Sequence, residues 1–191
     1  MIKIKDKKDS VVIMKTLGLN YFPLEVFDHN DKDGILKFVE KFPAKEYAVR
    51  DSSKAKGEFF FAKDYDEILK GISKYSGDVT ICVSYNPYKE NLVLVGDIKV
   101  HRGENEDDDI IDLTARDDVE ATHRNIYENP QYNFHTTIDD DRLWKVNGFA
   151  KIMRYVTDNN LYDVIVEFAV YNVPLGIKNN EVVISEIRTS Y

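Results

Sequence analysis

The chain has 191 residues, of which 43% are hydrophobic and 12% aromatic, and its formal net charge is −8. A chain of this length and apolar content can bury a sizeable core, which argues against disorder and favours a folded domain of ordinary to large size. The negative charge disfavours nucleic acid as the main partner, because the energy of binding a phosphate backbone comes mainly from Lys and Arg.

The single cysteine, Cys82, lies in the apolar run 79–83 and permits no intramolecular disulfide, which is typical of a reducing compartment. The first residues lack the apolar stretch of a secretory signal, and no run approaches the roughly 18 apolar residues of a membrane span. We therefore expect a cytoplasmic protein, with neither export nor insertion into a membrane.

Residues 1–44 are expected to form an N-terminal extension with one amphipathic helix. Short apolar runs at 2–5 and 11–14 predict small strands or one short helix. Segment 31–42 then places its apolar residues at helical spacing and ends at Pro43. This pattern predicts the amphipathic helix.

Residues 45–191 are expected to form the main domain, although one continuous domain over 1–191 stays open. Alternating apolar residues and turn signals predict several strands and one helix in its first half. The expected elements are strands at 46–50, 58–61, 79–85 and 92–100, and a helix from Asp64 or Asp66 to about Tyr75. The Asn86-Pro87 connection predicts that the last two of these strands form a hairpin or meander.

Segment 103–118 is the clearest break in composition, because its acidic run at 104–109 cannot enter a core. We expect an exposed loop, which is either simply solvated or contacts a basic protein partner, or weakly bound divalent ions, near Asp107. Segment 117–141 predicts only a possible short helix and irregular chain, whereas 147–158 predicts a second amphipathic helix. Strands that are grouped rather than alternating with helices indicate an α+β fold with a mainly antiparallel sheet and helices on one face.

Two strand-like runs near the end of the chain, 163–170 and 182–188, each carry one glutamate among apolar residues. If they pair as an antiparallel hairpin centred after Gly176, Glu167 lies directly across from Glu186. Opposed like charges cost stability unless a metal ion, a bound cation or a nearby Arg or Lys compensates them.

Arg188 lies on the same face of its run as Glu186 and is one such cation. A solvent-facing strand side with scattered charges explains the pattern equally well. A slip of one residue in the register would send Glu167 and Glu186 to opposite faces.

A second cluster of polar residues follows Arg50, at the end of an expected strand. Hydroxyl groups, ammonium groups and a glycine are gathered there: Ser52, Ser53, Lys54, Lys56 and Gly57. Such donors suit a phosphate, and glycine lets the backbone approach a ligand closely. A polar hairpin loop is the alternative, since the glycine spacing of a Walker A loop or a Rossmann fingerprint is absent.

The order of these features resembles the nucleotide-binding core of the ATP-grasp superfamily. The resemblance covers roughly residues 45–190 and consists of a strand ending in Arg50, the Lys/Ser/Gly loop, a strand, a helix, paired strands and two late acidic strands. It implies that Arg50 binds nucleotide phosphates and that 54–57 form a lid. It also implies that Glu167 and Glu186 coordinate Mg²⁺.

The same resemblance implies ATP and Mg²⁺ as cofactors and an ATP-dependent ligase or phosphotransferase reaction. Arg188 lies near the place where many members of the family have a metal-binding Asn, so a phosphate is its expected partner. The residues identify neither the acceptor substrate nor a catalytic group. A non-catalytic protein-binding or regulatory module is the alternative from another class.

Residues 29–40 resemble a calcium-binding loop only in part. Residues 29–40 match an EF-hand loop at several positions, but His29 replaces the first Asp and supplies nitrogen to a cation that prefers oxygen. Asp31 or Asp33 is then simply the N-terminal cap of the expected helix. The four histidines show no spacing typical of metal ligands.

Overall fold

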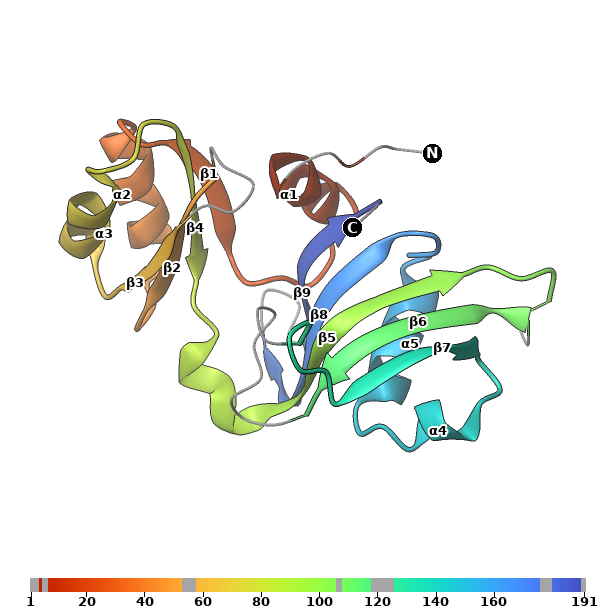
Figure 1. The fold of residues 1–191 in the computed structure, drawn as a ribbon. Coiled ribbons are helices and arrows are strands. Elements are labelled where there is room, and N and C mark those ends of the chain that lie inside the picture. The colour runs from red at the N-terminus through yellow and green to blue at the C-terminus, as the bar shows by residue number, and fades with distance from the viewer. Residues whose placement is uncertain are drawn as a thin grey trace. The chain divides into compact units, whose positions relative to one another are not determined.

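The computed structural model describes residues 4, 7–52, 58–105, 108–117, 126–175 and 180–189. The chain forms two compact units, one of residues 22–88 and one of residues 1–21 together with 89–191. The boundary expected between residues 44 and 45 lies inside the first of these. Each unit has its own antiparallel sheet (Figure 1).

The 22–88 unit is a four-stranded sheet in the order β1-β4-β2-β3 with two helices. Its strands are β1 (Leu24–Asp28), β2 (Tyr47–Asp51), β3 (Phe59–Ala62) and β4 (Asp78–Val83), and its helices are α2 (Lys32–Lys41) and α3 (Tyr65–Ile72). Ile35 and Phe38 of α2 pack with Ile68 of α3 and with Val49 and Ile81 of the sheet. The core of the unit therefore lies between the helices and one face of the sheet.

Both helices of this unit begin where the sequence predicts. Asp31 accepts a hydrogen bond from the backbone N–H of Gly34 at 2.9 Å, and Asp64 accepts one from the N–H of Glu67 at 2.9 Å. These side chains satisfy N–H groups that have no partner inside the first helical turn. The role of Asp31 as a cap is confirmed.

The second unit is a five-stranded sheet in the order β7-β6-β5-β8-β9 with three helices. Its strands are β5 (Leu92–His101), β6 (Ile110–Arg116), β7 (Tyr132–Thr137), β8 (Ile165–Leu175) and β9 (Asn180–Arg188). Its helices are α1 (Lys7–Thr16), α4 (Asp141–Trp144) and α5 (Phe149–Asp158), and a 3-10 helix, η1 (Asn86–Asn91), precedes β5. In Figure 1, α5 lies behind this sheet and α1 lies beside β9.

Helix α5 carries the apolar residues that the sequence places on one side, and Phe149, Ile152 and Val156 are fully buried. Gly148 precedes the helix with a φ of +89°, a conformation that L side chains rarely adopt. A Cβ there would also lie 3.2 Å from the Cβ of Leu94. Glycine thus allows α5 to begin close against β5.

Three expectations about segments are wrong. Strands β4 and β5 do not pair as a hairpin, because they belong to different sheets. Segment 103–118 is not all loop, since Ile110–Arg116 forms β6 between β5 and β7. The segment expected to be irregular includes β7. In β6 the alternate residues Ile111, Leu113 and Ala115 are buried, and this period of two was masked by the acidic run before it.

The α+β class is confirmed, with two antiparallel sheets rather than one. The register of the last hairpin is also confirmed, because Glu167 pairs with Glu186. Beyond that pair the register shifts, and Phe168 lies opposite Ile184. Among the residues that the structure describes, no helix is long and apolar enough to cross a membrane.

Candidate functional site

Three carboxylates form a row across neighbouring strands of the five-stranded sheet. Asp97 of β5 is paired with Glu167 of β8, and Glu167 is paired with Glu186 of β9. Directly paired residues of antiparallel strands project from the same face, so the three side chains share one face. The next residue along β8, Phe168, projects to the other face and is fully buried there. The row therefore concentrates negative charge on one side of the sheet.

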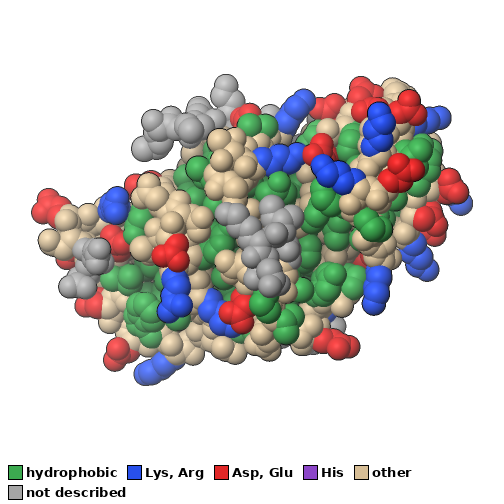
Figure 2. All heavy atoms as spheres, turned by 180° about the vertical axis from the view of Figure 1, so that it is seen from behind, with side chains coloured by type: hydrophobic (Ala, Val, Ile, Leu, Met, Phe, Trp, Pro, Cys, Tyr) green, Lys and Arg blue, Asp and Glu red, His purple; other side chains and the backbone are tan. Residues whose placement is uncertain are grey.

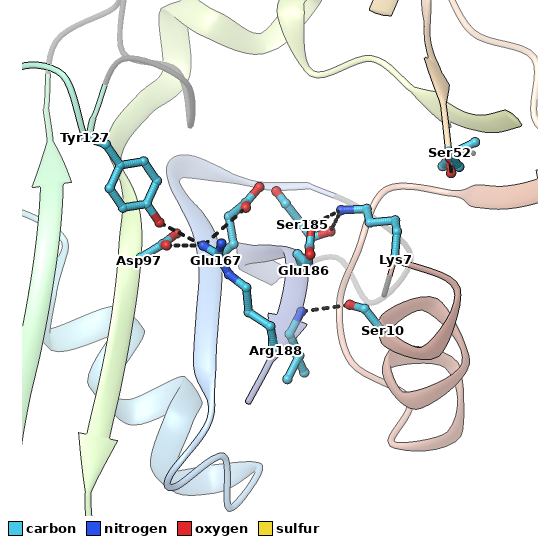
Figure 3. Close-up of polar contacts among 11 residues, drawn as sticks. Lys7, Ser10, Ser52, Asp97, Tyr127, Glu167, Ser185, Glu186 and Arg188 are labelled. Atoms are coloured by element: carbon cyan, nitrogen blue, oxygen red, sulfur yellow. Dashed lines mark hydrogen bonds and ion pairs between the residues drawn. The ribbon is translucent and has the colours of Figure 1, made fainter. Parts of the chain in front are cut away.

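Arg188 compensates the charge at the Asp97 end of this row (Figure 3). Its Nη2 donates a hydrogen bond to Oδ2 of Asp97 and another, of 2.8 Å, to the hydroxyl of Tyr127. The same nitrogen lies 3.9 Å from Oε2 of Glu167. One guanidinium from β9 thus joins a carboxylate on β5 and a carboxylate on the strand between them.

The side chain of Asp97 is fully buried, with an exposed fraction of 0%. Burial and the neighbouring Glu167 raise the pKa of Asp97 to about 7, although Arg188 acts in the opposite direction. Its Oδ1 has no hydrogen-bond partner among the described residues. A buried oxygen of this kind is costly unless a further ligand, a proton or water satisfies it.

Lys7 of α1 compensates the other end of the row. Its Nζ donates to Oε2 of Glu186 at 2.8 Å and to the backbone carbonyl of Ser185 at 2.8 Å. The side chains of Lys7 and Glu186 have exposed fractions of 22% and 19%. Figure 3 shows Lys7 reaching Glu186 from the start of α1.

Helix α1 and the residues after it lie along the outer edge of β9. The hydroxyl of Ser10 accepts a hydrogen bond of 2.8 Å from the N–H of Ile187, and the carbonyl of Asn20 accepts one of 2.8 Å from the N–H of Ile184. The side-chain amide of Asn20 donates to the carbonyl of Val182 at 2.5 Å. These contacts satisfy backbone groups of an edge strand and hold Lys7 near the row.

Two of the expected phosphate-binding residues belong to the other unit. Arg50 is exposed on β2, paired with Phe59 and Thr80. The hydroxyl of Ser52 lies 2.5 Å from the hydroxyl of Thr80, and its N–H donates to the carbonyl of Asp78. Residues 53–57 lie outside the described part of the chain, so the roles expected for Ser53, Lys54, Lys56 and Gly57 stay predictions.

The structure thus brings Glu167, Glu186 and Arg188 together, and it adds Asp97 and Lys7, which the sequence analysis did not select. Asp97 had a signal in the sequence, since it is the one acidic residue in the apolar strand 92–100. No sequence pattern indicates Lys7, because 178 residues separate it in sequence from Ser185.

The donor chemistry of this row fits Mg²⁺. Magnesium prefers hard oxygen ligands and is usually held by one or two carboxylates together with substrate phosphates and water. Glu167 and Glu186 supply such carboxylates, and the unsatisfied Oδ1 of Asp97 marks a further buried oxygen beside them. Within the described residues no group of three or more His, Cys, Asp or Glu is arranged to hold a metal ion by itself. A metal ion held at this row would therefore take two carboxylates from the protein rather than a full cage.

The acidic segment 104–109 supplies less evidence for a binding site than the carboxylate row does. Asp107 lies outside the described residues, and the nearby Asp109 is buried and accepts a hydrogen bond from the N–H of Gly103. Figure 2 shows acidic and basic side chains interspersed over the visible face. The contact of this loop with a protein partner stays a prediction.

Comparison with known proteins finds similarity in structure alone. No protein-family model and no curated protein matches the sequence. The D-alanine–D-alanine ligase of Helicobacter pylori matches with a TM-score of 0.52 and 14% identity, over 96% of this chain and 53% of its own.

Two solved structures of another enzyme match similarly. The N5-carboxyaminoimidazole synthetase of Staphylococcus aureus matches with a TM-score of 0.53 and 16% identity, over 97% of this chain and 44% of its own. An ADP complex of an N5-carboxyaminoimidazole ribonucleotide synthetase matches with a TM-score of 0.53 and 10% identity, over 99% of this chain and 45% of its own. The chain spans about half the length of these enzymes, and at these identities the likeness concerns the fold.

Proposed function

Because the chain has an ATP-grasp-like fold, we propose that it binds ATP together with Mg²⁺ on the polar face of its five-stranded sheet. The observation that carries the proposal is the pairing of Glu167 with Glu186 beside the buried Asp97, with Arg188 at the same place. A row of carboxylates with an arginine suits a metal-bound polyphosphate, because the carboxylates bind the metal and the guanidinium binds phosphate oxygens.

Each residue has a distinct proposed role. Glu167 and Glu186 hold the metal, which neutralises charge on the phosphates when bound. Arg188 contacts a phosphate beside its contacts with Asp97 and Tyr127. Arg50 and Ser52 are further phosphate contacts, proposed from the family resemblance and not from a distance to the row.

The reaction follows as a proposal from the fold alone. ATP-grasp relatives usually form an acyl-phosphate and pass the acyl group to an amine or thiol, so we propose an ATP-dependent ligase or a phosphotransferase. The acceptor is not identified, because the chain spans about half the length of the matching enzymes.

A non-catalytic binding or regulatory module is the second candidate, and one observation favours it. Glu186 already has Lys7 as a cation partner, and Asp97 already has Arg188. A carboxylate row compensated in this way is self-sufficient as a structural feature and does not require a metal for stability.

Isothermal titration of ATP, with and without Mg²⁺, distinguishes the two candidates. The proposal predicts saturable binding that needs Mg²⁺ and is lost in Glu186→Gln. Glu128→Gln removes the same charge from an exposed position and is the matched control, while thermal melting shows that each variant is folded. No heat at high micromolar ATP would reject nucleotide binding, and full binding by Glu186→Gln would reject the metal role of that residue.

A further inference from the structure

Lys7 holds Glu186 in a way that resembles the binding of a small cation. Its ammonium group has two oxygen partners, the carboxylate of Glu186 and the carbonyl of Ser185, both at 2.8 Å. Glu167 is the neighbour of Glu186 in the row, and Asp97 is the neighbour of Glu167. A second cation near the same carboxylate would be repelled by the ammonium group.

From these contacts we propose that Lys7 is a tethered cation that competes with divalent metal for Glu186. This inference rests on the proposed function of the row and adds a residue that governs it. Lys7 occupies Glu186 in the ligand-free protein, so a metal ion reaches that carboxylate only when the ammonium group leaves it.

The anchoring of α1 is independent of the Lys7 contact. Val11 and Met14 of the helix are buried, and Ser10 accepts a hydrogen bond from the backbone of β9. Release of Lys7 from Glu186 therefore leaves the helix in place. A partly exposed ion pair of this kind contributes little to stability, so its exchange for another partner costs little.

Arg188 differs from Lys7 in this respect. Its partner Asp97 is fully buried, and losing the guanidinium would leave that carboxylate without its cation. Of the two cations that the structure places on the row, Lys7 is the one that can exchange.

The tethered cation also links metal binding to an anionic ligand. When Lys7 leaves Glu186, the phosphates of a nucleotide offer its ammonium group a new partner. We therefore expect a free divalent ion to bind weakly, and an ion that arrives with ATP to bind more tightly.

The test measures the binding of Mn²⁺, which takes oxygen ligands as Mg²⁺ does, by electron paramagnetic resonance of the free ion. The nucleotide-free protein is compared with Lys7→Met, Lys7→Arg and Lys8→Met. Lys8→Met is the matched control, because Lys8 is the exposed neighbour on the same helix. The expected result is that Lys7→Met binds Mn²⁺ about twofold to fivefold tighter than the wild type, because the substitution removes a competing charge whose contribution is roughly that of one partly exposed ion pair.

Lys7→Arg keeps the charge and should bind Mn²⁺ as weakly as the wild type, and Lys8→Met should differ from the wild type by less than about twofold. Equal or weaker Mn²⁺ binding by Lys7→Met would overturn the inference, as would the absence of Mn²⁺ binding in every variant.

Titration of ATP into the same proteins separates this result from the proposed function. Mg²⁺-dependent ATP binding with no effect of Lys7→Met on Mn²⁺ would overturn the tethered cation alone. Tighter Mn²⁺ binding without any ATP binding would support the tethered cation and reject the nucleotide.

Discussion

Arg188 of β9 donates a hydrogen bond to Asp97 of β5, across the full width of the intervening strand β8. This contact gives a fully buried carboxylate its cation. It also links the edge strand of the sheet to the central one, so the two strands support each other through side chains as well as through β8.

We expect Arg188→Met to destabilise the protein by about 2 to 4 kcal/mol, because it leaves Asp97 buried without its cation. Adding Asp97→Asn should restore part of that loss at a pH above about 7, where Asp97 is ionised, since the uncompensated charge is then gone. Urea unfolding of the single and double variants measures both effects. Arg154→Met, at an exposed position of α5, is the control and should change stability by less than about 0.5 kcal/mol. Additive losses in the double variant would contradict the coupling.

Asp97 should make stability depend on pH between its ordinary pKa and the value in the fold. Its pKa rises from 3.8 to about 7, so the unfolded state releases this proton at a lower pH than the folded state does. The contribution of the protonated Asp97 to the free energy of unfolding is fully present below pH 4 and is lost as the pH rises to about 7. The difference between these two pKa values corresponds to roughly 4 kcal/mol of unfolding free energy.

Asp97→Asn removes this titration. The difference in unfolding free energy between the wild type and Asp97→Asn should therefore shift with pH in favour of Asn from pH 4 to pH 7. Urea unfolding at closely spaced pH values measures it. A constant difference over that range would show that Asp97 has an ordinary pKa in the folded protein.

Asn20→Ala should cost about 1 to 3 kcal/mol, because it removes the amide that donates to the buried carbonyl of Val182. The backbone N–H of Asn20, which donates to the hydroxyl of Tyr155, is kept. Chemical unfolding measures the loss. Hydrogen exchange should be fastest along β9 in this variant, and unchanged protection of β9 would contradict the role of Asn20 at its edge.

Gly96→Ala tests how closely the strand that carries Asp97 approaches β6. An added Cβ would lie 2.5 Å from the carbonyl oxygen of Thr114 and 2.7 Å from the Cβ of Ala115. Because backbone atoms cannot yield as flexible side chains do, we expect a loss of about 1 to 3 kcal/mol, measured by thermal or urea unfolding. A fully stable variant would mean that β5 and β6 can separate without cost.

The fold class and the Glu167–Glu186 pair were predictable because they depend on short-range patterns. Alternation of apolar residues, one acidic residue in each run and a turn between the runs determine which side chains face each other. The shift of register after Glu167 was not predictable in this way, because a β-bulge depends on local backbone geometry.

The contacts that complete the site could not be predicted from the sequence, for a different reason. The pairing of Asp97 with Glu167 and of Lys7 with Glu186 joins residues far apart in sequence. Patterns within a window of ten to twenty residues contain no information about such neighbours. The error about β4 and β5 has the same origin, since Asn86-Pro87 indicates a change of direction but not which sheet the next strand joins.

The hydrogen bond between Ser10 and Ile187 spans 177 residues of sequence. During synthesis on the ribosome, α1 emerges long before β9 exists, so this hydrogen bond cannot form until β9 has been made. The 22–88 unit, by contrast, is continuous in sequence and complete much earlier. We therefore expect this unit to be protected from a protease on a translating ribosome before the α1–β9 contact forms.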